Sequence, residues 1–150
     1  MNFNTKVSRY FTLHEALFLK SWNIYHIPTE KELEEISNFA KSLDLVRDLV
    51  GLPFIVHCWI RPLSVNNPES KYHKMDYNSF VGSKNPNGAH PKGRGCDFHV
   101  KGYELAEDCG IIRRMIVPHL EKLKLRMENL NGTWIHIDNL PKINERFFKP

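Results

Sequence analysis

Apolar residues recur at intervals of three and four between positions 30 and 50, and this period predicts an amphipathic helix. Thr29 precedes the stretch as a candidate N-cap, and Gly51 follows it as a natural stop. Thr12 and Glu15 form a capping-box pattern, which predicts a shorter helix that ends near residues 20–22. The buried stripe of the longer helix is expected to consist of Leu33, Ile36, Phe39, Ala40, Leu43, Val46, Leu49 and Val50.

Three further segments have the pattern of β-strands. Residues 53–60 form a short apolar run rich in β-forming residues, which is typical of a buried strand. Residues 96–100 and 133–138 alternate between polar and apolar positions, so each is expected to present two different faces. The dipeptide Asn131-Gly132 is a strong hairpin signal, and it predicts that the last strand pairs with one ending near Leu130.

Two other regions complete the predicted organisation. Residues 103–125 have a helical pattern that we expect Gly110 and Pro118 to interrupt. Residues 63–87 have no sustained period and are rich in Asn, Ser, Pro, Lys and Tyr, which predicts a long loop. Long loops in compact domains are usually functional or mobile. We therefore expect this one to form a wall or a lid of a cleft.

Composition places the chain among ordinary globular proteins. Its 150 residues predict a single domain over 1–150, and 41% of them are hydrophobic and 25% charged. The net charge of +4 favours anionic partners such as nucleic acid, a membrane surface or an acidic cell-wall polymer. No stretch approaches the roughly 20 apolar residues that a membrane span needs. We expect synthesis in the cytoplasm, because the first residues lack a signal-peptide pattern.

The three cysteines add little to this picture. Cys58, Cys96 and Cys109 are odd in number and show no C-x-x-C spacing. This pattern argues against a disulfide framework and against a thiolate zinc site. We expect reduced and mostly buried thiols.

The candidate chemistry lies in two segments that are far apart in the sequence. His90 and Asp97 are seven positions apart, and Gly93 and Gly95 between them disfavour a regular helix. His136 lies on the last predicted strand, which would hold its side chain on a rigid element. Two histidines and one carboxylate are a typical set of protein ligands for a catalytic zinc ion.

Zinc with three protein ligands keeps a position for water and lowers the pKa of that water to about 7. A nearby carboxylate must then move the proton. Glu128 and Asp138 are the two candidates; we favour Glu128, which precedes the last ligand strand, whereas Asp138 can instead orient a ligand. Arg61 closes the strand 53–60 and suits either a substrate carboxylate or a structural ion pair.

These motifs resemble those of the M15 group of zinc D-alanyl-D-alanine carboxypeptidases and murein L,D-endopeptidases, which share a fold with the Hedgehog signalling domain. The family pattern H-x-x-G-x-A-x-D reads as His90, Gly93, Gly95 and Asp97, with glycine in place of alanine. The W-x-H motif reads as residues 134–136. The family segment with G-Y-R-S after an apolar strand is similar to residues 58–61.

The likeness extends beyond the candidate ligands, from about residue 10 to residue 138. The opening F-T-L-x-E reads at residues 11–15, and the family run V-G-G-S-K-x-S-x-H is similar to residues 81–90. Two positions depart from the pattern. Thr133 stands where many members have an acidic residue three before the last histidine, and Gly88 stands where serine is usual. The departure at Thr133 leaves the identity of the general base open.

The resemblance implies an α+β fold with an antiparallel sheet, helices packed on one side and a zinc cleft on the open face. It implies a monomeric zinc peptidase that cleaves an amide of the peptidoglycan stem peptide at the cell wall, reached by phage-type release or delivery, and it implies no nucleic-acid partner. Zinc would be held by His90, Asp97 and His136. The expected substrate-binding residues are Arg61, Ser83 and Trp134. The alternative is a catalytically silent, zinc-stabilised wall-binding or virion structural module.

Overall fold

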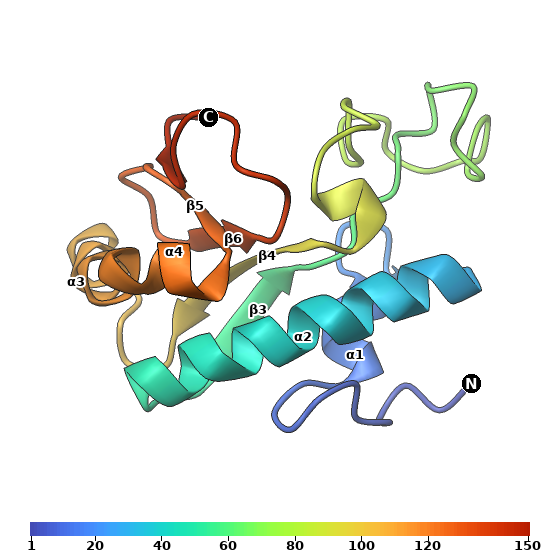
Figure 1. Ribbon diagram of the computed structural model, residues 1–150. Helices are drawn as coiled ribbons and strands as arrows, with labels where there is room; N and C mark the ends of the chain where they lie inside the picture. Colours follow the sequence, from blue (N-terminus) through green and yellow to red (C-terminus); the bar gives the residue numbers. More distant parts are fainter.

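The computed structural model describes residues 1–150, and its centre is a mixed sheet of five strands (Figure 1). In spatial order the strands are β3 (Phe54–Cys58), β4 (Gly95–Val100), β6 (Ile135–Asp138), β5 (Arg126–Glu128) and β7 (Phe147–Phe148). The prediction of a wholly antiparallel sheet is wrong at one edge, where β7 pairs parallel with β5. The chain reverses after β6 and passes to the far side of β5, so β7 enters the sheet in the direction of β5.

The predicted pairing of the strand 133–138 with the strand before it is confirmed. β5 and β6 are antiparallel, with Met127 opposite Ile137. The connection, however, spans residues 129–134 and is longer than the two-residue turn that Asn131-Gly132 predicts. The longer connection brings Trp134 out of the strand and onto the surface of the cleft described below.

The longest helix, α2 (Glu30–Val50), agrees closely with its prediction. The Thr29 hydroxyl caps it by accepting from the Glu32 amide, and Gly51 ends it in the left-handed conformation with φ +79°. The stripe residues Ile36, Phe39 and Leu43 are fully buried. No helix of the structure has the length and the apolar character that crossing a membrane requires.

The other helices are short. They are α1 (Leu13–Leu17), the 3₁₀ turn η1 (His90–Lys92), α3 (Ala106–Ile116), η2 (Val117–His119) and α4 (Leu120–Leu123). The predicted capping box of Thr12 and Glu15 starts α1, but the helix ends earlier than expected. A small hairpin, β1 (Phe18–Leu19) with β2 (Ile24–Tyr25), replaces its last turn. Asn23 at the tip adopts φ +52°, a conformation that asparagine tolerates well.

Pro118 separates α3 from α4 as predicted, but Gly110 does not interrupt α3. A glycine inside a helix costs about 1 kcal/mol. Burial of Cys109, Ile112 and Ile116 on either side of it offsets that cost, because packing of an apolar face supplies most of the stability of a helix.

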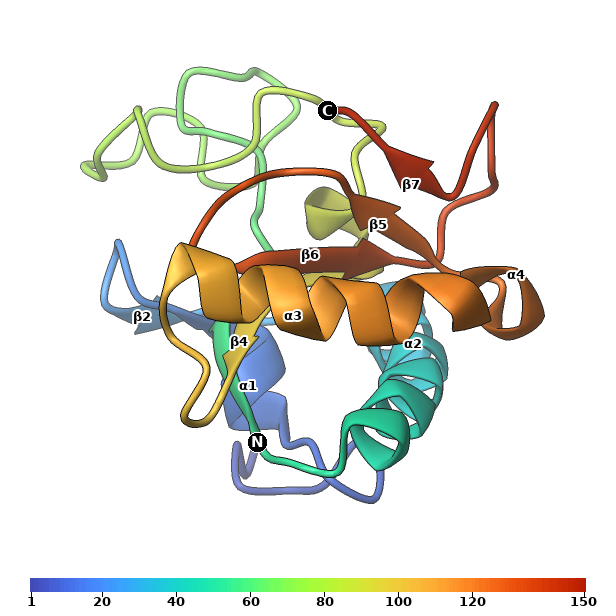
Figure 2. The same ribbon diagram turned by 90° about the vertical axis from the view of Figure 1, so that its left-hand side faces the viewer.

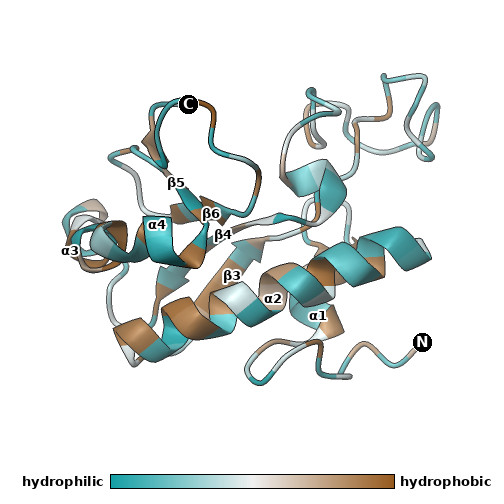
Figure 3. Ribbon diagram, viewed as in Figure 1, coloured by the Kyte–Doolittle hydropathy of each residue, from teal (hydrophilic) through white to brown (hydrophobic).

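The core lies between the helices and one face of the sheet. Figure 3 shows hydrophobic residues concentrated on β3 and on the C-terminal half of α2. Phe54 and Phe98 stack there with ring centroids 4.2 Å apart, and residues from α1, α2, α3 and α4 join the same cluster. Figures 1 and 2 show α1 and α2 beneath the sheet and the loop 63–87 above it. The opposite face of the sheet is thus left for polar side chains.

Candidate metal centre

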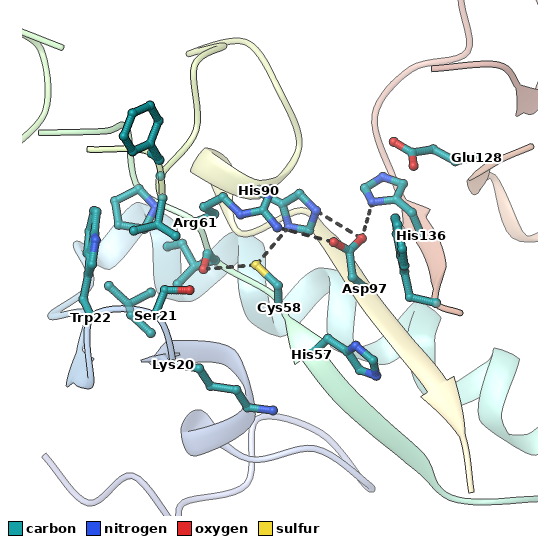
Figure 4. A pocket seen from close by; sticks show the side chains of 17 residues that line it. Lys20, Ser21, Trp22, His57, Cys58, Arg61, His90, Asp97, Glu128 and His136 are labelled. Atoms are coloured by element: carbon teal, nitrogen blue, oxygen red, sulfur yellow. Dashed lines mark hydrogen bonds and ion pairs between the residues drawn. The ribbon is translucent and has the colours of Figure 1, made fainter. Parts of the chain in front are cut away.

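A cleft of about 560 Å³ lies over this polar face (Figure 4). The β1–β2 hairpin contributes Lys20 and Trp22 to its wall, and the ends of β3, β4 and β6 contribute the residues of the candidate site. The loop 63–87 contributes Phe80, Val81 and Gly82. The prediction that this loop forms a wall of a cleft is therefore confirmed.

His90 and His136 approach the same carboxylate oxygen. His90 Nε2 lies 3.2 Å and His136 Nδ1 lies 2.8 Å from Asp97 Oδ1. Asp97 and His136 come together because they are register partners on β4 and β6. His90 reaches the same point from η1, which ends at Gly93 in the left-handed conformation with φ +70° before the chain enters β4. Two segments far apart in the sequence are thus joined by strand pairing.

Each histidine has its other ring nitrogen occupied. His90 Nδ1 donates to the Trp59 carbonyl at 2.7 Å, and His136 Nε2 donates to Asp138 Oδ2 at 2.8 Å. Histidines that ligate metals usually donate their second nitrogen to a carbonyl or a carboxylate in this way, which fixes the tautomer and the ring orientation. The remaining nitrogens, His90 Nε2 and His136 Nδ1, both face Asp97.

Asp138 is itself firmly held beneath the site. Its side chain is 1% exposed and accepts two hydrogen bonds from the Arg126 guanidinium, at 2.7 and 2.9 Å. The pairing of β5 with β6 produces this contact, because Arg126 and Asp138 are register partners. Asp138 is not among the residues that line the cleft. This placement favours the orienting role over that of a general base.

The Asp97 carboxylate, which both histidines contact, influences the protonation of His90 and His136. Burial alone would lower the pKa of both histidines, but their hydrogen bonds to carboxylates outweigh it. Asp97, with a smaller contribution from Cys58, raises the pKa of His90 to about 10. Asp138 and Asp97 together raise the pKa of His136 to about 9. The pKa of Asp97 is well below its usual range, because bonds from both histidines outweigh its burial. Positive charge is favoured at this point, whether carried by protons or by a metal ion.

These pKa values predict a pH dependence for the metal-free protein. A histidine whose pKa is raised by folding contributes stability below its unfolded value of about 6.5, and that stability is lost as pH rises to about 9 and 10. The melting temperature with a chelator present should therefore fall between pH 6.5 and pH 10. The increase caused by stoichiometric zinc should grow over the same range, because protons then compete less for the ligands. A zinc effect that is independent of pH would contradict this account.

Cys58 is the residue that sequence analysis missed. Cys58, His90 and Asp97 each offer a ligand atom within 4.8 Å of the others, so this cluster can hold a metal ion. The spacing argument against a thiolate site considered only pairs of cysteines and not a single thiol beside a histidine. No sequence pattern indicated Cys58. Regular alternation from Phe54 would place it in the core.

A β-bulge turns Cys58 away from the core. Val56 pairs with Phe98, but Cys58 pairs with Asp97, so one extra residue, His57, is accommodated in β3. Bulges re-aim side chains in this way and occur often beside functional sites. The thiol comes to lie 3.9 Å from His90 Nδ1 (Figure 4). The proton on that nitrogen is directed to the Trp59 carbonyl at 2.7 Å, which favours a metal-ligand role for His90 over activation of the thiol as a nucleophile.

Three of the other predicted residues face the cleft. Glu128 is next to Met127 on β5, and since Met127 is in the core, strand alternation turns Glu128 to the side of His136. Figure 4 shows the two side chains next to each other. Arg61 Nη2 lies 3.5 Å from Asp97 Oδ2, and the Arg61 side chain is 42% exposed. Trp134 also lines the cleft and is 38% exposed.

Ser83 does not line the cleft, although its neighbour Gly82 does. Its hydroxyl donates to the Asn85 carbonyl at 3.2 Å, and its amide donates to the Pro62 carbonyl at 2.8 Å. These bonds tie the loop 63–87 to the segment that follows Arg61. Ser83 is thus next to the lining of the cleft without being part of it.

Arg113 is a second residue that the sequence analysis did not single out. It lies in α3, is 5% exposed, and donates to the carbonyls of Gly132 and Trp134. These bonds fix the connection that carries Trp134 and leads into the strand of His136. An arginine inside the apolar stripe of a helix is the only signal by which sequence reasoning could have found it.

The chain was compared with models of protein families, with curated proteins and with solved structures, and none of the three comparisons finds a match.

Proposed function

We propose that the protein is a zinc-dependent peptidase of the M15 type that cleaves an amide of the peptidoglycan stem peptide. One observation carries the proposal: one ring nitrogen of His90 and one of His136 converge on Asp97 Oδ1, and the second nitrogen of each is held by a protein acceptor. Two imidazoles and a carboxylate on the wall of an accessible cleft suit zinc and leave a coordination position for water.

Zinc bound here would polarise the substrate carbonyl and supply a water of lowered pKa. The residues of the chain would do the rest. Glu128, beside His136, would accept the proton of the water and pass it to the leaving amine. Arg61 would hold a substrate carboxylate with its planar fork, and Trp134 would pack against the peptide. Ser83 would contribute only through the position of its loop, because its hydroxyl is bonded to Asn85.

The wall polymer suits the charge of the protein. The net charge of +4 favours acidic polymers, and Lys20 and Arg61 add positive charge at the cleft. Its site of action would be the cell wall, reached by phage-type release or delivery.

The direct test is digestion of purified peptidoglycan by the zinc-loaded protein, with mass spectrometry of the released fragments. We expect the wild type and the control His119→Gln, an exposed histidine outside the cleft, to cut the wall. His136→Gln should lose both zinc and activity. Cys58→Ser should keep both, because the proposed ligands are His90, Asp97 and His136. Retention of zinc by His136→Gln and its loss by Cys58→Ser would instead assign the metal to the Cys58 cluster.

The second candidate is a zinc-stabilised wall-binding or structural module without activity. Thr133, at the position where many members of the M15 group have an acidic residue, favours it. In that case zinc would raise the melting temperature while no stem-peptide bond is cut under any condition. Cleavage that depends on Glu128 would eliminate this alternative.

A further inference from the structure

Two histidines outside the group around Asp97 face each other on neighbouring strands. His57 is the extra residue of the bulge in β3, and His99 lies on β4 opposite Ile55. The two ring nitrogens, Nε2 of His57 and Nδ1 of His99, are 2.5 Å apart, and the ring planes are nearly perpendicular at 86°. His57 lines the cleft beside Cys58 (Figure 4).

The surroundings of His99 restrict the orientation of its ring. Its other nitrogen, Nε2, is directed to the carboxylate of Glu104 at 4.0 Å. That distance is longer than a hydrogen bond, so Glu104 adds negative charge near His99 without fixing the tautomer of the ring. The His99 side chain is 17% exposed, so its orientation is restricted by packing. To bind one ion, the two nitrogens must separate from 2.5 Å to about 3.3 Å, the spacing that Zn–N bonds of about 2.0–2.1 Å require at a tetrahedral angle.

The local charges set the strength of such a site. The Lys20 amine donates to the Val56 carbonyl at 3.1 Å and brings a positive charge close by. The carboxylate of Glu104, 4.0 Å from His99 Nε2, also lies further from this pair than Asp97 lies from His90 and His136. An ion here is expected to bind more weakly than one held by His90, Asp97 and His136.

We propose that His57 and His99 form a second transition-metal site at the cleft, for a borderline divalent ion such as Zn²⁺ or Cu²⁺, with water completing the coordination. Imidazole ligands suit these ions and not Mg²⁺ or Ca²⁺. The inference does not depend on the proposed peptidase activity, because it rests on residues that the mechanism does not use.

The test is a zinc titration followed by native mass spectrometry and calorimetry. The wild type should bind one equivalent of zinc more than either His57→Gln or His99→Gln, and the lost equivalent should be the weaker one. His119→Gln should match the wild type. If the site around Asp97 holds no zinc, the wild type should bind one equivalent and the two variants none, so failure of the peptidase proposal remains distinguishable. Equal stoichiometry in the wild type and both variants would overturn the inference.

A second measurement uses the wild-type protein, so its result does not depend on whether the variants fold. Cu²⁺ added in substoichiometric amounts to the zinc-loaded protein should broaden the ring signals of His57 and His99 in NMR spectra first. Signals of His119 and His14, which lie outside the cleft, should broaden only at higher concentration. Broadening that starts at these two histidines would also overturn the proposed site.

Discussion

Replacing Glu128 with glutamine is expected to lower kcat by about 10²- to 10⁴-fold, the range typical for loss of a general base. Glutamine keeps the shape of the side chain beside His136 but cannot accept the proton of the water. Glu128 forms no hydrogen bond or ion pair with the candidate ligands His90, Asp97 and His136. The zinc content of the variant should therefore be unchanged. Hydrolysis of a synthetic stem peptide, with zinc measured on the same samples, checks both expectations.

The matched control is Glu121→Gln. Glu121 is 73% exposed and pairs with Arg146 and Lys142, and it does not line the cleft. Its variant should hydrolyse the peptide at the wild-type rate. Undiminished activity of the Glu128 variant would remove Glu128 from the mechanism.

Replacing Asp138 with asparagine is expected to act on zinc binding and stability first. It weakens the acceptor of His136 Nε2 and leaves the Arg126 guanidinium without its anionic partner. Breaking a buried ion pair on one side costs about 3 to 5 kcal/mol in the free energy of unfolding. Loss of an orienting partner of a metal ligand lowers affinity by about 10- to 100-fold. Chemical unfolding and zinc competition with a chromophoric chelator measure the two effects.

Asp48→Asn provides the comparison, since Asp48 also pairs with an arginine, Arg9, but at an exposed position. Exposed pairs contribute little, so this variant should be far more stable than the Asp138 variant and should bind zinc normally. A large loss of kcat in Asp138→Asn with unchanged zinc affinity would instead identify Asp138 as the base. Comparison of the Glu128 and Asp138 variants thus separates proton transfer from ligand orientation.

Local sequence patterns were sufficient to predict an element when the periodicity and the capping residues lie within or next to that element. The helix α2 has a stripe of apolar residues, a capping residue at Thr29 and a stop at Gly51, and the structure has it over Glu30–Val50. The two different faces predicted for residues 96–100 are confirmed, because Cys96, Phe98 and Val100 are buried in the core. That same alternation placed Asp97 on the polar face, where it meets His136 through strand pairing.

The sequence by itself therefore determined the main helix, the polar face of the sheet and the residue types of the candidate site, because these depend on periods of two and 3.6 residues. Only the tertiary structure decided which side chains meet. The bulge at His57 reverses the alternation and brings Cys58 to His90, and the register of β5 with β6 buries Asp138 against Arg126 while it turns Glu128 to the cleft. A bulge and a strand register arise from pairing between distant segments, and a one-residue shift in either changes the face that every following side chain occupies.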